Sequence, residues 1–524
     1  MFKNQPKGLI PAALSNMGER FGYYIMNAVL VLFLCSKFGL SGETSTAIYS
    51  CFYAGIYILS LVGGYIADKT QNYKGTIING LIVMTLGYVV LSVPILATPQ
   101  NNTWLLGLTC VALFLIAFGN GLFKGNLQAL VGQLYESPKY SAQRDSGFQI
   151  FYVFINIGGL IAPFVAPMLR SWWLNANNMT YNAALPELCH KYLSVADSMN
   201  TENIDNLYAL ATAAGTDVST FCTRYLEVFN TGIHYSFIAS VAAMLISLAI
   251  FLITKKQLPS PAAREKAAAQ NYSEAEKKAM ASEIKQRMYA LFAVLGIVIF
   301  FWFSFHQNGT SLTLFARDFV TTDKIAPEIW QAVNPFFVIV LTPLIMWLFS
   351  ALSKRGRAIS TPKKIAIGMG LAAVAYLFLC VYSWIQAYPS GDTFREMSES
   401  VKEGMKAGPW LLIAIYFFLT VAELFISPLG LSFVSKVAPK HLQGLCQGLW
   451  LGATAVGNLL LWIGPLMYNK WPISWAWGVF VIVCLISMSV MFGMVSWLER
   501  VTSDAPAVAA EAAKPIKDDE KDVI

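Results

Sequence analysis

Twelve long runs of apolar residues follow one another along the chain, separated by shorter polar segments. Most of them are about 20 residues long or longer, which lets an α-helix cross a hydrocarbon layer about 30 Å thick. Unpaired backbone groups are too costly in lipid, so runs of this kind must be helical. The pattern predicts an all-α protein with twelve transmembrane helices, over residues 9–38, 46–67, 76–97, 104–128, 147–169, 232–254, 288–316, 330–352, 364–387, 409–434, 443–468 and 473–498.

The composition indicates the same class of protein. Of the 524 residues, 56% are hydrophobic and only 13% are charged, whereas soluble proteins carry about 25% charged residues. A soluble enzyme, a nucleic-acid-binding protein and a disordered scaffold all fit poorly. The first run resembles a signal peptide, but Glu19 and Arg20 interrupt it. We therefore expect it to remain as the first span of a membrane protein.

The basic residues predict the orientation of the chain. Its net charge is +7, and 25 of its 37 Lys and Arg residues lie in segments on the same side as both termini. Lys and Arg accumulate in cytoplasmic loops of membrane proteins. We expect a multi-pass protein of the plasma (inner) membrane with both termini in the cytoplasm.

A polar linker separates two halves of six helices each. In each half a short basic turn follows the second helix, DKTQNYKG at 68–75 and SKRGR at 353–357. Such a repeat is typical of a two-bundle transporter with its site near the midplane. Within the linker, YSEAEKKAMASEIKQR predicts a surface helix leading into the seventh span. The expected segments are an N-terminal bundle over 1–254, a cytoplasmic linker over 255–287, a C-terminal bundle over 288–499 and a disordered tail over 500–524.

A long outer loop is expected over 170–231, and it contains Cys189 and Cys222. Both cysteines would face an exported, oxidising compartment, where disulfides form. Their spacing does not decide between a disulfide and two free thiols. The other six cysteines lie in the spans and are interpreted as core residues.

Few ionisable side chains lie within the predicted spans, where they are costly and usually functional. They are Glu19, Arg20, Lys124, His306 and Glu423. Asp68 lies at the cytoplasmic end of the second span, where it is expected to belong to a gate or a turn.

Polar residues recur at intervals of three or four in five spans, so each set shares one helix face. One such residue can be structural glue between helices, the interpretation that we favour for Gln128 and Asn458. Five sets, present in both halves, instead indicate a water-accessible central cavity. The sets are Asn16, Glu19, Arg20, Tyr23, Tyr24 and Asn27; Asn120, Lys124 and Gln128; Gln149, Tyr152 and Asn156; Thr420, Glu423 and Ser427; and Gln447, Trp450, Thr454 and Asn458.

The charges in the spans favour a zwitterionic ligand. Glu19, Arg20, Lys124 and Glu423 sum to zero when all are ionised. A ligand with a carboxylate at one end and an ammonium at the other would find complementary poles. Alternatively, Glu19, Arg20 and Lys124 form a buried ion network that only holds the bundle. That alternative leaves Glu423 without a partner in its own half.

Eight segments along the chain resemble one known family, the proton-dependent oligopeptide transporters (POT) of the major facilitator superfamily. GERFGYYIMNAVL resembles the family's ExxERFxYY motif, and GGYIADKTQNYKGTI resembles its signature after the second span. The resemblance covers about residues 10–500 and implies the major facilitator fold. The remaining segments are GLFKGNLQALVGQLY, FYVFINIGGLIAP, FHQNGTSLTLFA, WQAVNPFFVIVLTPL, AELFISPLGLSFVSKVAP and GLWLGATAVGN.

The resemblance implies uptake of di- and tripeptides, driven by an inward proton gradient through alternating access of the two bundles. By position, Arg20 and Lys124 would hold the peptide carboxylate, and Glu423 would hold its amino group. Trp450 would line a side-chain pocket. The residues expected to contact the peptide backbone are Tyr23, Tyr24, Tyr57, Asn156 and Asn334.

The chain departs from the family pattern where protons are expected to act. Asn16 replaces the first acid of ExxER, Asn27 replaces an arginine of the first span, and His306 replaces an acid of the seventh. An outer ion pair would thus become a hydrogen bond between Asn27 and His306. The proton would then be carried by Glu19, Glu423 or His306, since histidine titrates near neutrality.

Two other functions are alternatives to proton-coupled peptide uptake. One is a facilitative or differently coupled carrier of another small zwitterion, anion or peptide-like conjugate. The other is a membrane-embedded enzyme, which would need a metal cluster or a nucleophile–base pair within the spans. The spans offer neither, so we expect no enzyme, no metal and no cofactor. The expected partners are a small peptide, the proton and the lipid bilayer, with no nucleic acid, and the protein is expected to function as a monomer.

Overall fold

The computed structural model describes residues 4–40, 42–98, 100–182, 185–195, 201–260, 274–321 and 332–503. Throughout these residues the regular elements are helices, and one isolated β-bridge joins Val320 to Ala407. Twelve helices are long and apolar enough to cross a membrane. The predicted all-α fold with twelve spans is confirmed.

The spanning helices of the first half are α1 (Leu9–Phe38), α2 (Gly42–Thr70), α3 (Tyr73–Ser92), α4 (Asn102–Gln133), α6 (Arg144–Ala176) and α9 (Val218–Thr254). Those of the second half are α11 (Glu274–Phe305, continued by η3, His306–Gly309, and α12, Ser311–Phe319), α13 (Val333–Lys354), α14 (Thr361–Ile385), α17 (Trp410–Val437), α18 (Gln443–Leu459, continued by α19, Ile463–Lys470) and α20 (Ile473–Ser503). Shorter helices lie between them: α5 (Pro138–Ser141), α7 (Leu185–Val195), α8 (Thr201–Ala213), η2 (Lys255–Gln257), α15 (Gly391–Glu396), α16 (Glu399–Met405) and η5 (Lys440–Leu442).

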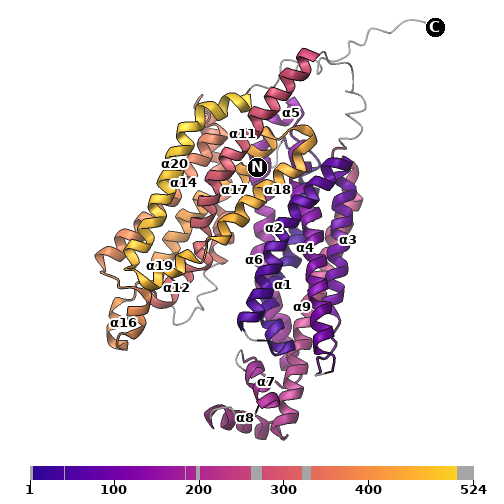
Figure 1. The fold of residues 1–524 in the computed structure, drawn as a ribbon, viewed down its shortest axis with the longest axis vertical. Helices are drawn as coiled ribbons and strands as arrows, with labels where there is room; N and C mark the ends of the chain where they lie inside the picture. Colours follow the sequence, from indigo (N-terminus) through magenta and orange to yellow (C-terminus); the bar gives the residue numbers. More distant parts are fainter. Residues whose placement is uncertain are drawn as a thin grey trace, which may run out of the picture.

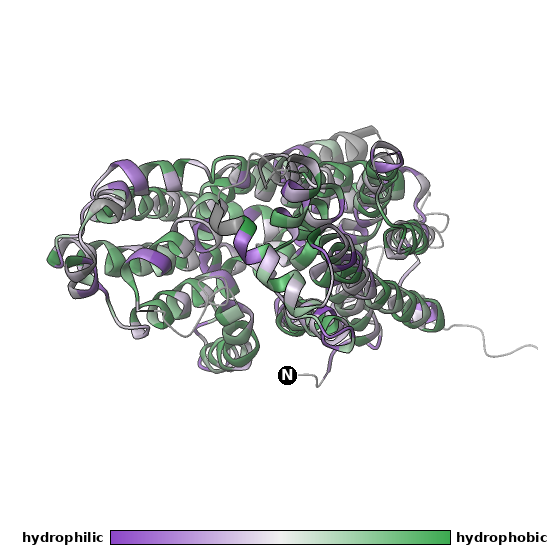
Figure 2. Ribbon diagram, turned by 90° about the horizontal axis from the view of Figure 1, so that it is seen from below, coloured by the Kyte–Doolittle hydropathy of each residue, from purple (hydrophilic) through white to green (hydrophobic). Residues whose placement is uncertain are grey.

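Each half packs into its own bundle. In the first half α1 lies against α6 and α9, and α4 lies against α2 and α3; in the second, α14 lies against α17 and α20, and α18 lies against α11. Hydrophobic residues dominate both groups of helices in Figure 2, which shows the molecule from below. Many large apolar side chains point outward, such as Trp347 (69% exposed) and Ile253 (80% exposed). Lipid is the solvent of these side chains, so their exposure costs little.

The two bundles meet toward the end of the molecule at which both termini lie (Figure 1). There α18 packs against α2 and α4, and α13 and α17 pack against α6. We call this end, formed by the helix ends at Thr70, Gln133, Arg144, Thr361 and Val437, the terminal face. Toward the opposite end, which carries α7, α8 and α16, the ribbons of the two bundles diverge (Figure 1).

The segment 170–231, predicted as an outer loop, is largely helical. Helix α6 continues to Ala176, α7 and α8 follow, and α9 begins at Val218 rather than at the predicted residue 232. The many polar residues of this segment lower its mean hydropathy, so the pattern of long apolar runs does not indicate its helices. Helix α7 buries Leu185 and Cys189, and α8 buries Leu207 and Ala211, so both helices have an apolar inner face.

Two spans that were predicted as continuous helices are broken. The seventh changes at His306 from α-helix into 3₁₀ helix, and the eleventh is interrupted between Leu459 and Ile463. The breaks contact each other, because Leu461 O accepts a hydrogen bond from Gln307 Nε2 at 3.4 Å. Broken helices of this kind recur at the sites of two-bundle transporters.

The predicted linker and tail are only partly covered by the described residues. The surface helix that was predicted before the seventh span is the first part of α11, which begins at Glu274. Residues 261–273 of the linker and 504–524 of the tail lie outside the described residues.

Candidate functional site

The set of polar residues on α1 includes an ion pair between two adjacent residues. Arg20 Nε donates to Glu19 Oε2 at 2.5 Å, and Arg20 Nη2 donates to Glu19 Oε1 at 2.6 Å. Asn120 on α4 adds a third donor, with Nδ2 at 2.7 Å from Glu19 Oε1. The Arg20 guanidinium also lies 4.7 Å from the centre of the Tyr23 ring. Glu19 and Arg20 are both buried, so each side chain neutralises the other away from water.

Lys124 stands apart from this ion pair. Its ammonium lies over the Tyr57 ring, 5.2 Å from the ring centre, and no carboxylate within the described residues forms an ion pair with it. Of the alternative Glu19–Arg20–Lys124 network, the structure therefore shows the Glu19–Arg20 pair without a direct ion pair to Lys124. Lys124 is a cation held by an aromatic face, and it can accept an anionic group.

The Tyr57 ring that lies under Lys124 belongs to a group of tyrosines on α1 and α2. The Tyr57 hydroxyl is 3.0 Å from that of Tyr53, and the rings of Tyr23 and Tyr24 are 5.4 Å apart. The structure thus brings together the three predicted tyrosines and adds Tyr53. The four-residue spacing of Tyr49, Tyr53 and Tyr57 on one helix face could have indicated this residue.

Glu423 on α17 lies where the two bundles meet. It accepts hydrogen bonds from the Tyr152 hydroxyl on α6 and from Asn334 Nδ2 on α13, the latter at 2.7 Å. Asn334 Nδ2 also lies 3.1 Å from Thr420 Oγ1. Among the residues that the structure describes, no cation forms an ion pair with Glu423, which is 4% exposed. Its partners are neutral donors from both halves, so the carboxyl group has no cationic partner in the described residues and can pair with a cationic ligand.

His306 binds within its own half rather than across the bundles. Asn458 Oδ1 accepts a hydrogen bond from His306 Nδ1 at 2.5 Å, and the imidazole stacks on Trp302 at 4.9 Å. Asn27 Oδ1 has no hydrogen-bond partner in the described part of the chain. The predicted Asn27–His306 hydrogen bond is therefore absent, and His306 Nδ1 binds Asn458 of its own half instead.

Asn156 and Trp450, which were predicted to contact the peptide, instead contact residues of their own bundle. Asn156 Nδ2 donates to the backbone oxygen of Tyr152 at 3.0 Å. Trp450 is 2% exposed and packs on α17, where a Cβ added to Gly430 would lie 1.9 Å from its ring. Trp450 is thus a packing residue in this conformation.

Polar contacts between the bundles close the terminal face. Asp68 on α2 accepts hydrogen bonds from the backbone N–H groups of Gly444 and Leu445, at 2.9 and 2.7 Å, and from the Tyr73 hydroxyl. The two amides open α18, so the carboxylate lies at a helix N-terminus, where negative charge is favourable. Asp68 therefore occupies a contact between the halves.

Asp145, which the sequence did not indicate, joins α6 to α14 and α17 at the same face. Its carboxylate lies 2.8 Å from Lys364 Nζ and 2.7 Å from Lys436 Nζ. Ser432 and Thr361 donate further hydrogen bonds to it, at 2.6 and 3.0 Å. The two halves are thus fastened at the terminal face.

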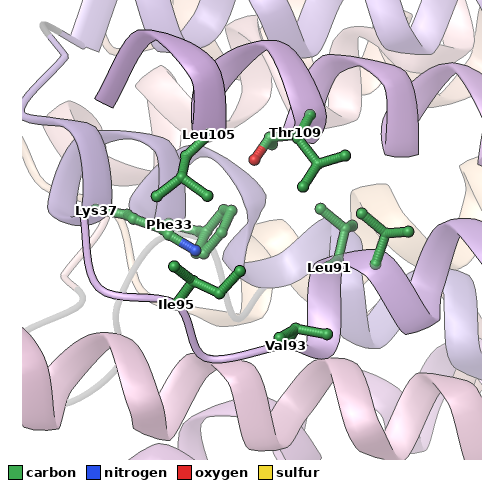
Figure 3. Close-up of a pocket in the computed structure, with 9 residues that line it drawn as sticks. Phe33, Lys37, Leu91, Val93, Ile95, Leu105 and Thr109 are labelled. Atoms are coloured by element: carbon green, nitrogen blue, oxygen red, sulfur yellow. The ribbon is translucent and has the colours of Figure 1, made fainter. Parts of the chain in front are cut away.

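A small cavity near the other end of the first bundle is not the site of a peptide. It lies between α1, α3 and α4, and Figure 3 shows Lys37 pointing toward Phe33 and Ile95 there. Lys37 Nζ is 3.2 Å from His234 Nε2. The cavity encloses about 10 Å³, which is close to the room that one water molecule needs.

Cys189 and Cys222 are two free, buried thiols in this structure. Within the described residues, no group of three or more His, Cys, Asp or Glu side chains is arranged to hold a metal ion.

The fold and the polar groups between the bundles define a two-bundle transporter of the major facilitator type. A solved structure of peptide transporter POT in complex with sulfate matches with a TM-score of 0.58 and 21% identity, over 96% of this chain and 97% of that chain. A POT family transporter in complex with 5-aminolevulinic acid matches with a TM-score of 0.58 and 17% identity, over 96% and 98%. At these identities the likeness concerns the fold.

The chain belongs to the POT family, whose sequence profile matches residues 74–189 and 261–475. Dipeptide and tripeptide permease B of Edwardsiella piscicida is 28% identical over 471 residues, which cover 87% of this chain and 86% of the relative. Dipeptide and tripeptide permease B of Photorhabdus asymbiotica subsp. asymbiotica is 29% identical over 472 residues, with the same coverage. The protein is therefore a multi-pass membrane transporter and not an enzyme.

Proposed function

We propose that this protein takes up di- and tripeptides by alternating access of its two bundles. The observation that carries the proposal is the pair of opposite charges left without ionic partners in the described residues, Lys124 in one half and Glu423 in the other. A peptide carries a carboxylate at one end and an ammonium group at the other. Binding of one ligand by both halves couples the ligand to their relative movement. The names of the curated relatives support peptides as the ligand.

In this proposal Lys124 binds the peptide carboxylate and Glu423 binds the amino group. Arg20 contributes to the carboxylate site only when Glu19 releases it, because both guanidinium contacts are now made to Glu19. Hydroxyl and amide groups then contact the peptide backbone, from Tyr23, Tyr24, Tyr57, Asn156 and Asn334. These groups set the register, while side chains of varied size are tolerated by apolar surroundings.

Protonation of Glu19 would release Arg20 and couple a proton to peptide binding. A neutral carboxyl no longer attracts the guanidinium, so Arg20 becomes free for the incoming carboxylate. His306 and Glu423 are the other candidate proton carriers. His306 faces Asn458 and Trp302, both neutral, so its protonation would add an uncompensated charge beside the broken helices. The alternative to coupling is facilitated movement of peptides or of another small zwitterion down their own gradient.

The proposed orientation places the terminal face in the cytoplasm, following the distribution of Lys and Arg. With that face closed, the structure corresponds to an outward-facing state in the plasma membrane. Asp68 and the Asp145 contacts form the closed cytoplasmic gate. One chain holds both poles of the ligand site, which supports function as a monomer.

Peptides with blocked ends test the proposal. In proteoliposomes, the wild-type protein should take up a dipeptide and discriminate against its N-acetylated and C-amidated forms. Glu423→Gln should lose discrimination against the N-acetylated form alone, and Lys124→Gln should lose discrimination against the amidated form alone. Glu187→Gln, at an exposed site, is the matched control. Dipeptide uptake by Glu423→Gln that equals wild-type uptake, with discrimination intact, would exclude the zwitterion site.

A further inference from the structure

The Asn120 amide on α4 has one half bound to Glu19 and the other half unused. Its Nδ2 donates to Glu19 Oε1 at 2.7 Å and lies 4.0 Å from Met84 Sδ on α3. Glu19 and Asn120 are both completely buried. The amide oxygen, Oδ1, is also buried and has no hydrogen-bond partner in the described residues. Asn120 therefore presents a donor to Glu19 and carries an unused acceptor on the same group.

Close packing of α3 and α4 fixes the backbone at Asn120 but not its amide. A Cβ added to Gly119 would lie 2.6 Å from the backbone oxygen of Gly80, and one added to Gly80 would lie 2.7 Å from that of Gly119. The helix next to Asn120 therefore has no room to shift toward α3. The χ2 angle of asparagine, in contrast, has a broad and roughly two-fold profile. A half-turn about it exchanges the positions of Oδ1 and Nδ2.

Protonation changes what Glu19 requires of its neighbours. An ionised carboxylate only accepts hydrogen bonds, whereas a protonated carboxyl also carries an O–H that donates one. In this structure Glu19 accepts from two nitrogens of Arg20, at 2.5 and 2.6 Å, and from Asn120. A protonated Glu19 releases the guanidinium and has its O–H away from water. A buried donor without an acceptor is costly, so the protonated form requires an acceptor within reach.

We propose that Asn120 is a positioning residue that binds both protonation states of Glu19 by turning its amide. With Glu19 ionised, Nδ2 donates to the carboxylate, as in this structure. With Glu19 protonated, the half-turn directs Oδ1 toward the carboxyl group, whose O–H donates to it. The proton stays on Glu19, and Arg20 is released while Glu19 keeps a hydrogen-bond partner. The inference rests on the proposed role of Glu19 as the proton carrier.

Other titratable groups face Glu19, but Asn120 is not bound to them. Those that interact electrostatically with Glu19 are Arg20 and Tyr24 on α1, Tyr88 on α3 and Lys124 on α4. On α2, the Tyr53 and Tyr57 hydroxyls bind each other. The groups that α6 and α9 place against this part of α1 are neutral, namely Gly158, Gly159, Ser240 and Ser247. Among the described residues, the only one of these groups that Asn120 could influence by a direct hydrogen bond is Glu19 itself.

Infrared difference spectra of the purified protein in lipid test the inference. The protonated-carboxyl band that disappears in Glu19→Gln belongs to Glu19, and its growth is followed as the pH falls. In Asn120→Leu the ionised form keeps both Arg20 contacts, while the protonated form loses its acceptor. The midpoint of the band should therefore move by about one unit to lower pH, and its C=O stretch should move to higher wavenumber. Both shifts should be smaller in Asn120→Ser, whose hydroxyl donates and accepts.

Asn126→Leu is the matched control, since Asn126 is also buried on α4 but donates to the backbone oxygens of Gly63 and Leu122. Its Glu19 band should match that of the wild type. Asn120→Ala, which also lacks the amide, gives the same test if Asn120→Leu does not fold.

An unchanged band in these Asn120 variants would overturn the inference. A midpoint at higher pH would also overturn it, because Asn120 would then stabilise only the ionised form. The absence of any band that depends on Glu19 would do so as well. Dipeptide uptake is measured separately, and its failure in the wild-type protein, with both shifts as expected, would count against the transport proposal alone.

Discussion

Two acidic residues in the spans have different surroundings, and the difference separates their roles. Glu19 is bound by Arg20 and Asn120 within one bundle, whereas Glu423 is bound by Tyr152 and Asn334 from opposite bundles. A carboxylate that is paired with a cation releases that cation when it is protonated. A carboxyl group bound only by neutral donors has no protein cation as a partner and can pair with a cationic group of a ligand. We therefore assign coupling to Glu19 and ligand binding to Glu423.

Glu19→Gln should separate binding from coupling. The glutamine carries no charge at any pH, so Arg20 loses its counterion permanently. We expect peptide exchange without a gradient to persist, while accumulation driven by a pH gradient falls by about tenfold or more, the usual size of coupling between two sites. Both quantities are measured with labelled dipeptide in proteoliposomes. Accumulation equal to that of the wild type would instead indicate that His306 or Glu423 carries the proton.

Tyr152→Phe should weaken peptide binding without unfolding the protein. It removes a hydroxyl that donates to the Glu423 carboxylate from the opposite bundle, and hydrogen bonds to charged groups contribute about 1.5–3 kcal/mol. The apparent KM for a dipeptide should rise by roughly tenfold or more. Tyr208→Phe, at a half-exposed site on α8, is the control. An unchanged KM at unchanged thermal stability would show that Tyr152 does not position Glu423.

Between elements, the contact that closes the terminal face depends on glycine. A Cβ added to Gly64 on α2 would lie 2.5 Å from the backbone oxygen of Gly444 on α18, and one added to Gly448 would lie 2.9 Å from Ser60 O. Only residues without a side chain permit helices to approach this closely. The closed terminal face is therefore sensitive to single methyl groups.

Gly64→Leu should prevent closure at this face. Spin labels at Thr70 and His441, exposed positions on opposite halves, should report a longer distance than in the wild-type protein, and uptake should fall. Gly296→Leu is the control, since nothing lies within 4 Å of a Cβ added at Gly296. The same label distance in both variants would contradict the role of the glycine contact.

Asp145→Asn should open the terminal face by removing a charge, whereas Gly64→Leu should do so by adding a large side chain. It leaves Lys364 and Lys436 without the carboxylate that they share. Breaking a fully buried ion pair costs on the order of 3 kcal/mol, and this partly buried one should cost less. The same pair of labels should then show a larger population at long distance. Asp392→Asn is the matched control, because the pair of Asp392 with Lys470 is exposed and such pairs contribute little. Equal effects of the two substitutions would contradict a gate at Asp145.

For the whole molecule, the direction of the proton gradient should set the direction of peptide movement. Protonation from the outside would free Arg20 in the outward-facing state, so uptake into vesicles should rise as the external pH falls. An inward proton gradient should drive accumulation, and a protonophore should abolish it. Accumulation that is indifferent to the gradient would favour the facilitative alternative. Uptake at equal pH on both sides is the control.

The sequence predicted the fold because lipid imposes a simple rule. A run of about 20 apolar residues must be a helix in a bilayer, and the twelve spans follow from that rule. Helices α7 and α8, and the ends of α6 and α9 that reach into 170–231, were not predicted, because they lie outside the long apolar runs. The breaks at His306 and after Leu459 were also missed, since hydropathy averages over several residues and does not register a local change of helix type.

The sequence by itself also determined which residues are chemically unusual. Glu19, Arg20, Lys124, His306 and Glu423 are ionisable groups in apolar runs, and no structure is needed to notice them. Only the tertiary structure decided how they are paired. It joined Glu19 to Arg20, left Lys124 over an aromatic ring and gave His306 to Asn458. It also placed Asp145 between the bundles, because long-range pairing depends on which helices meet and in which conformation they do so.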